Sequence, residues 1–269
     1  MSDDGSDMGS RSTTTKTSPL RLHEYGARLG SSRFLSQPLF VLYKGALTIE
    51  LVFWAIYWPY EEGREMWKYF NFWLWDSMAI YFCVSFITAY LYLERGPDDE
   101  GKGSCIINVL GWFQLAFWYL CCIISLVVLL LHWVFLDDGE PLDSVDINIH
   151  CLAAIFMIID NLLVAMEYRL EYVWPASLFI IMYTGFNIAW YYITPRKNGN
   201  HIIYDQVQWD EEPVRASEIV IGIFFVLVPI FHVFHFIVYR VREGLAGCGS
   251  SKSQGNHHMF DTKSIITHR

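Results

Sequence analysis

The sequence has few charged residues and lacks features that mark secreted or disulfide-stabilised proteins. Charged residues make up 17% of the 269 positions, and no Asn-X-Ser/Thr sequon occurs, so N-glycosylation is not expected. The six cysteines follow no paired spacing, and most of them fall inside apolar runs, where a thiol behaves as a small hydrophobe. Residues 1–37 are polar and put the first apolar run far from the start, so no cleavable signal peptide is expected.

Long apolar runs are what the sequence has in abundance. Hydrophobic residues make up 54% of the chain and the mean hydropathy is +0.27. Six runs are each long enough, at about 1.5 Å per residue, to cross roughly 30 Å of hydrocarbon as a helix. They cover residues 38–60, 69–93, 106–136, 147–166, 173–194 and 216–239. Because the runs are continuous rather than alternating, they predict helices and not the strands of a membrane barrel.

The predicted fold class is therefore all-α: a polytopic membrane protein built as a bundle of six transmembrane helices. The bundle should cover residues 38–239. The flanking segments, 1–37 and 240–269, are rich in Ser, Thr and Gly, and we expect them to be largely disordered cytoplasmic tails.

The distribution of basic residues predicts the orientation of this bundle. The side that holds both tails carries thirteen Lys and Arg residues, and the opposite side carries five. By the positive-inside rule both termini should be cytoplasmic, in the plasma membrane or an endomembrane. The net charge of −9 belongs to loops and tails and implies no nucleic-acid partner; membrane lipids are the only partner that the sequence predicts.

Ionisable residues inside the apolar runs are the informative ones, because each is costly in hydrocarbon. Lys44 lies near one membrane edge, and we expect it to extend to the interface. Glu50 lies mid-helix and should either pair with a basic or amide group of a neighbouring helix or be protonated. Asp160 should serve a neighbouring helix too. His232 and His235 share a helix face, but no third ligand accompanies them, so neither a metal nor a cofactor is predicted.

A further set of polar residues falls near the outer ends of the helices. Its members are Asn71, Asp76, His132, His150, Asn187 and Glu218. His150 and Asn161 are eleven residues apart and project on one face, at about 100° per residue. We expect Asn161 and the outer set to line a polar pocket for a lipid headgroup, with His150 hydrogen-bonded to Asn71 or Asp76. The alternative is that His132 and His150 are interfacial residues without such a role.

Three segments together carry a family resemblance. They are WKYFNFWLW at 67–75, NIHCLAAIFMIIDNLL with the following EYRLEYVWP, and HIIYDQVQWDEEP at 201–213. In this order they resemble the rolling stone proteins and the related androgen-induced and androgen-dependent multi-pass membrane proteins, over roughly residues 35–240. The rolling stone branch is linked to myoblast fusion, and the resemblance implies an integral membrane protein without an assigned activity.

The androgen-induced branch implies a different function. Those proteins are threonine hydrolases that cleave fatty acid esters of hydroxy fatty acids, using a Thr at the start of helix two and a His at the start of helix four. The His corresponds to His150, but Asn71 stands at the nucleophile position. An amide nitrogen cannot replace an activated hydroxyl in a covalent mechanism, so a membrane-embedded lipid-ester hydrolase remains the alternative.

Overall fold

The computed structural model describes residues 28–61, 63–95, 105–136, 147–195 and 201–257. Within these ranges the chain is helical and contains no strand; one isolated antiparallel bridge joins Ser32 to Val164. Five helices are long and apolar enough to cross a membrane, and a shorter apolar helix covers His150–Leu163. The predicted all-α, multi-pass membrane fold is confirmed.

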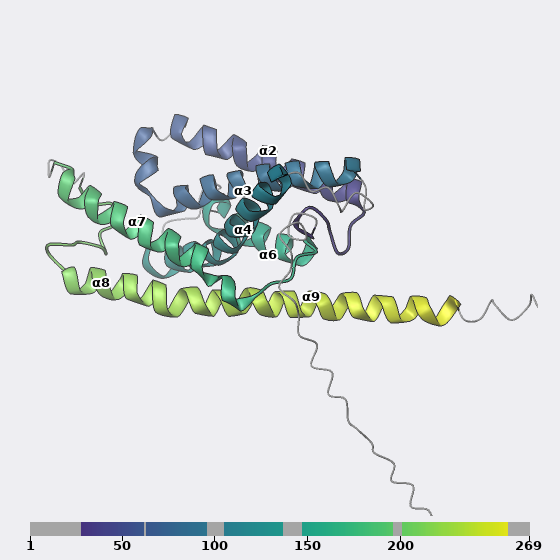
Figure 1. The fold of residues 1–269 in the computed structure, drawn as a ribbon. Coiled ribbons are helices and arrows are strands. Elements are labelled where there is room, and N and C mark those ends of the chain that lie inside the picture. Colours follow the sequence, from purple (N-terminus) through teal and green to yellow (C-terminus); the bar gives the residue numbers. More distant parts are fainter. Residues whose placement is uncertain (1–27, 62, 96–104, 137–146, 196–200, 258–269) are drawn as a thin grey trace, which may run out of the picture.

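The first two crossings form an antiparallel pair. Helix α2 (Gln37–Glu61) is followed by a short 3-10 helix, η1 (Arg64–Lys68), and then by α3 (Phe70–Arg95). The reversal between them uses Gly63 at φ 85°, a conformation that favours glycine. Helix α2 packs along α3 and forms one edge of the bundle (Figure 1).

Helix α4 (Cys105–Leu131) lies at the centre. It packs against α3, α6, α7 and α9, and every residue from 121 to 128 is buried. An apolar stretch on all faces fits this central part of α4, whereas Val109, Trp112 and Phe113 nearer its start are exposed. Its last turn continues as a π-helical turn, η3 (His132–Leu136).

The fourth crossing is shorter than expected. It begins as a π-helical turn, η4 (Ile147–Leu152), and continues as α6 (Ala153–Leu163), whereas the apolar run extends to residue 166. The helix ends because Val164 is extended, with φ −64° and ψ 137°, and pairs with Ser32. The carbonyl groups freed at this end find partners outside the helix, which removes the cost of stopping early.

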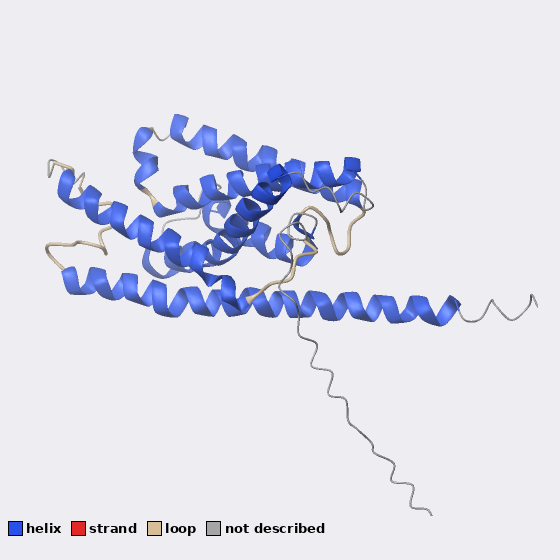
Figure 2. Cartoon of the chain, viewed as in Figure 1, coloured by secondary structure: helices blue, strands red, loops and turns tan. Residues whose placement is uncertain are grey.

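The last two crossings end the bundle. Residues Leu170–Val173 form the 3-10 helix η5, which leads into α7 (Trp174–Ile193). After a loop come α8 (Pro213–Gly222), the π-helical turn η7 (Ile223–Leu227) and α9 (Val228–His257), one continuous helix along the edge opposite α2 (Figure 2). The π-turn precedes Pro229: the Val228 N–H bonds to the carbonyl of Ile223, and Pro229 has no N–H to donate.

Helix α9 also differs from the prediction, because it continues past residue 239 to His257, where the composition predicts disorder. Extending an established helix costs less than starting one, which accounts for helix in this Gly- and Ser-rich segment.

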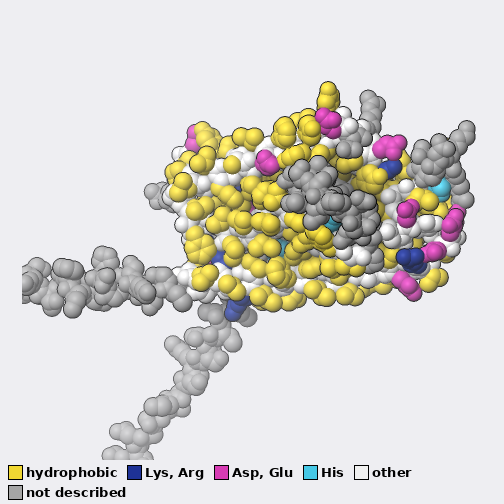
Figure 3. Space-filling view, turned by 180° about the vertical axis from the view of Figure 1, so that it is seen from behind, with side chains coloured by type: hydrophobic (Ala, Val, Ile, Leu, Met, Phe, Trp, Pro, Cys, Tyr) yellow, Lys and Arg dark blue, Asp and Glu magenta, His cyan; other side chains and the backbone are white. Residues whose placement is uncertain are grey.

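Two ends of the bundle are distinguished below. The arm end holds the N-terminal arm, residues 28–36, and the loop end holds the loop 201–212 between α7 and α8. In the space-filling view the wall of the bundle is apolar, while acidic and basic side chains gather towards its ends (Figure 3). A wide apolar wall between two polar ends is the surface expected of a membrane-spanning protein.

Candidate functional site

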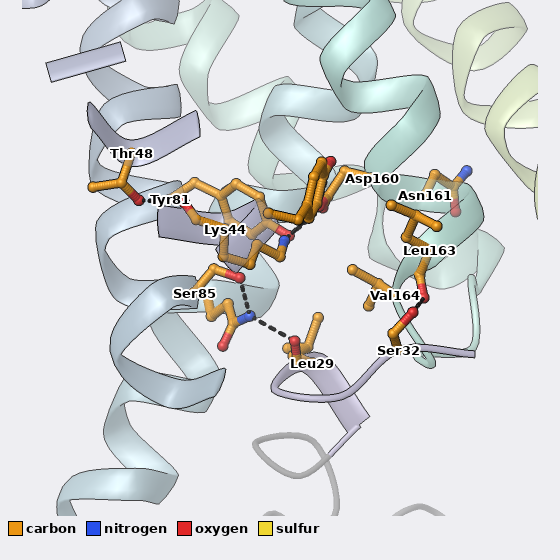
Figure 4. Close-up of polar contacts among 12 residues, drawn as sticks. Leu29, Ser32, Lys44, Thr48, Tyr81, Ser85, Asp160, Asn161, Leu163 and Val164 are labelled. Atoms are coloured by element: carbon orange, nitrogen blue, oxygen red, sulfur yellow. Dashed lines mark hydrogen bonds and ion pairs between the residues drawn. The ribbon is translucent and has the colours of Figure 1, made fainter. Parts of the chain in front are cut away.

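A buried charged cluster joins three helices in the arm half of the bundle. Lys44 of α2 forms an ion pair with Asp160 of α6, and both side chains are fully buried. The Tyr81 hydroxyl of α3 donates to Asp160 Oδ2 over 2.5 Å and accepts from Lys44 Nζ over 3.1 Å, while Tyr43 donates to Oδ1 over 3.3 Å. Three donors from two other helices therefore converge on one carboxylate (Figure 4).

Lys44 departs from the prediction, which placed its amine at the membrane interface. Its Nζ lies instead among aromatic rings, 4.8 Å from the centre of Tyr81, 4.9 Å from Phe82 and 5.2 Å from Phe40. An ammonium over ring faces gains cation–π attraction, which is strongest where water is excluded. The prediction was wrong because it considered the depth of Lys44 but not a carboxylate at the same depth. Asp160 does serve neighbouring helices, as expected.

Asn161, the next residue along α6, binds α9 on the opposite side of the bundle. The Asn161 amide donates to the His235 carbonyl over 3.0 Å and contacts His235 Nδ1 over 3.1 Å, which makes Nδ1 an acceptor. One turn earlier on α9, His232 Nε2 bonds to the Leu170 carbonyl and Nδ1 to the Tyr168 hydroxyl, each over 2.9 Å. Since a carbonyl only accepts, Nε2 carries the hydrogen and Nδ1 accepts from Tyr168.

These contacts occupy both ring nitrogens of His232 and Nδ1 of His235, while His235 Nε2 is buried without a hydrogen-bond partner among the described residues. Burial raises the pKa of Tyr168 well above its ordinary value, so the hydroxyl stays protonated and remains a donor to His232. In the described part of the chain, no three His, Cys, Asp or Glu side chains group as metal ligands would. Cys83, Cys121, Cys122 and Cys151 are free thiols.

Arg242 is the functional residue that the sequence did not reveal. The charge count placed it among cytoplasmic bases, but its side chain is fully buried. Its guanidinium donates to the carbonyls of Asn161 (3.0 Å), Val164 and Met166 (2.7 Å), at and just past the end of α6. A signal was present: Arg242 lies seven residues after His235, two turns along the same face of α9.

The N-terminal arm covers the same end of α6 from the other side. The Ser32 hydroxyl and the Arg33 N–H both donate to the Leu163 carbonyl over 2.8 Å. Gln114 of α4 donates to the Leu29 carbonyl over 3.1 Å and to Ser85 of α3 over 3.0 Å (Figure 4). The arm is thus bonded to α4 and α6, and Gln114 links it onward to α3, although composition predicted the arm to be part of a disordered tail.

At the loop end, His132 and His150 come together. Their rings stack with centroids 3.6 Å apart and planes 6° apart, and both residues lie in π-helical turns. His150 is 6% exposed, and its Nδ1 has no hydrogen-bond partner in the part of the chain that is described. His150 thus faces α4; no hydrogen bond among the described residues joins it to Asn71 or Asp76.

The other members of the predicted polar pocket have partners outside the predicted set or are exposed to different degrees. Asn71 Oδ1 accepts from the Phe72 N–H over 3.0 Å, and Asn187 accepts from the Trp209 indole over 2.7 Å. Asp76 is half-buried on α3, and Glu218 is exposed on α8. Asn161 faces α9 in the arm half. Of the predicted set, the structure brings only the two histidines into direct contact.

The loop 201–212 is held against the ends of α3 and α7. The Phe70 N–H, at the start of α3, donates to the Tyr204 hydroxyl over 2.9 Å, and Tyr191 donates to Asp210. Burial raises the pKa of Tyr204 to about 12, so its hydroxyl is neutral at physiological pH. The loop is therefore bonded to the start of α3 and to α7 at this end of the bundle.

The comparisons with known proteins give one match. The model of a family described as protein rolling stone matches residues 102–250, more than half of the 269 residues. No curated protein and no solved structure matches the chain.

Proposed function

The chain belongs to the rolling stone protein family, and from that premise we propose that it is a non-catalytic multi-pass membrane protein. Its intramembrane polar groups hold helices together instead of acting on a substrate. The protein then acts through its membrane-facing surfaces and its two ends. The family resemblance implies a process such as cell–cell fusion.

This proposal rests on the hydrogen bonding of the Lys44–Asp160 cluster, whose polar groups already have partners within the protein. Lys44 and Asp160 are ionisable groups in the arm half, yet both oxygens of Asp160 accept hydrogen bonds and neither side chain is exposed. A catalytic base or nucleophile needs a free position facing a substrate. A closed cluster of this kind is typical of a structural lock.

Position 71 supports the same conclusion. Asn71 uses its side-chain oxygen to accept the Phe72 N–H at the start of α3, as a local backbone cap does. An ester hydrolase with a covalent intermediate would need a hydroxyl or thiol there.

A fluorophosphonate probe, applied to the purified full-length protein, tests the proposal. We expect no covalent labelling under conditions in which a serine hydrolase, added to the same detergent, is labelled fully. Labelling of the wild-type chain that disappears in a His150→Ala variant would overturn the proposal.

The stacked histidines favour a second candidate, a lipid-ester hydrolase. His150 Nδ1 is buried without a described partner, and π-helical turns are frequent at functional sites. This candidate predicts hydrolysis of a fatty acid ester of a hydroxy fatty acid by the purified protein, with loss of activity in His150→Ala. Turnover that is unchanged in that variant, or absent in the wild type, would eliminate it.

A further inference from the structure

The polar networks described above leave two carboxylates without a partner on another helix. Among the described residues Glu50 of α2 bonds only to Trp54 of its own helix, whose indole donates to Oε1 over 2.7 Å, so its predicted pairing with a neighbouring helix is wrong there. Glu218 of α8 is exposed and has no bond in the same part of the chain. Whereas α2 packs along α3, α8 packs extensively on no described helix except its own continuation, η7.

The two halves of the last crossing are held in different ways. In α9, His232, His235 and Arg242 are buried and bond to α6 or to the segment that follows it. In α8 only Ala216 is buried. No side-chain hydrogen bond among the described residues joins α8 to another helix. One continuous helix thus has an anchored half at the arm end and a half without helix neighbours at the loop end.

The length of the fourth crossing explains why α8 has no neighbour. Helices α6 and α9 are antiparallel and meet where Asn161 bonds to His235. His150 lies eleven residues before Asn161, about 16 Å along the axis, so Phe224, eleven residues before His235, lies at the same depth. The described part of the fourth crossing begins at Ile147, less than one turn further on. Helix α8 therefore extends beyond the end of the helix on which α9 packs.

Helix α7 packs on α3 at this end instead of on α8. The rings of Phe70 and Tyr183 have centroids 4.8 Å apart, and those of Trp73 and Phe186 have centroids 5.0 Å apart. Figure 1 shows α7 and α8 apart at the loop end, with the loop 201–212 between them.

Two hydrogen bonds hold this loop to α7, and we call them the latch. The Trp209 indole donates to Asn187 over 2.7 Å, and the Tyr191 hydroxyl donates to Asp210. Since α8 begins three residues after Asp210, the latch also fixes where α8 starts. The loop end of α8 is thus held through the loop and not through packing.

The turn η7 is the joint between the two halves. The Val228 N–H bonds to the Ile223 carbonyl, and Pro229 has no N–H, so one bond between successive turns is missing here. Helices bend at prolines and at π-helical turns. Ile223, Phe224 and Leu227 pack against the hydrophobic core, whereas no side chain of α8 does. Bending at η7 therefore moves α8 and leaves the core in place.

We propose that α8 and the loop 201–212 form a lid that hinges at η7 and is closed by the latch. Opening separates α8 from α7 and gives membrane lipid a lateral path to the depth of His150, where it stacks on His132. Lipid is the molecule that enters, because the opening between two membrane-spanning helices faces the bilayer. The arm end keeps its bonds in both positions, since all of its anchors lie beyond the hinge.

Distances between paired spin labels, measured by pulsed electron spin resonance on the full-length protein in lipid nanodiscs, test the lid. One pair joins Ala189 of α7 to Ile221 of α8, and the matched control pair joins Leu178 of α7 to Ile237 of α9; all four side chains are exposed. The distance distribution of the α7–α8 pair should be about twofold wider, because that pair alone spans the hinge. The labels are attached to introduced cysteines in a chain that keeps the wild-type midpoint of thermal unfolding and carries alanine at Cys83, Cys105, Cys151 and Cys248.

Two variants test the latch and the hinge. Tyr191→Phe/Trp209→Phe removes both latch donors and should lengthen the mean α7–α8 distance by about 2 Å or more. Pro229→Ala supplies the missing N–H and should narrow the α7–α8 distribution. The control pair should be unchanged in both. If the double variant does not fold, Tyr191→Phe alone, which removes a single hydroxyl, is measured. Equal widths for the two pairs in the wild type, or an α7–α8 distance that is unchanged without the latch, would show that there is no lid.

A phospholipid with a photoactivatable diazirine in its acyl chain tests what enters. In the same nanodiscs, loss of the latch should raise the labelling of η4 severalfold, because the path to His150 is then open. Labelling of α2, which faces lipid in both positions, should stay constant and serves as the control. A lid that moves without any rise in labelling at η4 would overturn the assignment of lipid as the molecule that enters.

Discussion

The arm end and the loop end of the bundle use polar groups in opposite ways. At the arm end, Asp160 has three donors and Arg242 binds three carbonyl groups, so helices far apart in sequence are joined by buried or partly buried bonds. Two buried atoms in that half, Asn161 Oδ1 and His235 Nε2, have no hydrogen-bond partner among the described residues, but neither carries a charge. At the loop end, His150 has an unpartnered nitrogen in the described chain and Glu218 is exposed. The helices there also change to π-helical turns, at His132–Leu136 and Ile147–Leu152.

This difference indicates which end is fixed and which can adjust. A satisfied buried network holds one arrangement, because any displacement leaves a charge or carbonyl without a partner. Stacked rings and π-helical turns lose little when the backbone shifts. We therefore expect a rigid arm end and an adjustable loop end, and substitutions at the two ends should differ in their effects on the free energy of unfolding.

The largest effect is expected at the charged cluster. Lys44→Met leaves Asp160 buried without its counter-charge, which should lower the free energy of unfolding by about 3–5 kcal/mol. The double variant Lys44→Met/Asp160→Leu should recover more than half of that loss, because a well-packed apolar pair replaces a buried ion pair at little cost. Denaturant titration in detergent measures both. Equal instability of the single and double variants would contradict the ion-pair account.

Arg242 should have the next largest effect. Arg242→Ala removes the donors to the carbonyl groups at the end of α6, and we expect a loss of about 2–4 kcal/mol. Protease cleavage should also increase in the extended segment 164–169, which those bonds hold. Arg242→Lys provides the control: a single ammonium reaches fewer carbonyls, so stability should lie between the wild type and the alanine variant.

A smaller effect is expected at the arm. Ser32→Ala removes the hydrogen bond to the Leu163 carbonyl and the two that the hydroxyl accepts from the Phe34 and Leu35 N–H groups, while the Arg33 N–H keeps its bond to the Leu163 oxygen. The loss should be about 1 kcal/mol. Hydrogen exchange should rise in residues 29–36 and stay unchanged in α7. Exchange that rises throughout the bundle would mean that the arm stabilises the whole fold.

The smallest effect is expected at the loop end. His132→Ala removes the ring that stacks on His150, and the free energy of unfolding should fall by about 1 kcal/mol or less. Hydrogen exchange in the η3 and η4 turns should increase, with the arm end unaffected. A loss as large as that of Lys44→Met would show that the loop end is as rigid as the arm end.

The sequence predicted the helices well, because runs of apolar residues report directly on burial in hydrocarbon. The six crossings appear within a few residues of their predicted bounds, except where Val164 ends α6 early and where α9 continues to His257. Asp160 was also predicted correctly to serve a neighbouring helix, since its position on α6 set its direction.

Partners between helices were harder to predict. The direction of a side chain follows from helical periodicity, but its partner depends on which helices are adjacent and at what depth. Lys44 was expected at the interface because no sequence pattern links it to a carboxylate 116 residues later. Arg242 was missed for a similar reason: its acceptors are backbone carbonyls, which exist only where α6 ends, and no sequence motif marks that end.

The arm also has a consequence for the order in which the protein assembles. Ser32 is synthesised 131 residues before its acceptor, Leu163, and Arg33 is synthesised 210 residues before Glu243, with which it forms an ion pair over 3.1 Å. At about 5–20 residues per second, the first part of the chain to leave the ribosome waits on the order of ten seconds for its last partner. The arm is able to bind the end of α6 before α9 exists, but its ion pair with Glu243 forms only after the final helix has been made. A nascent chain that stops before α9 leaves Arg33 without its carboxylate and the end of α6 without Arg242.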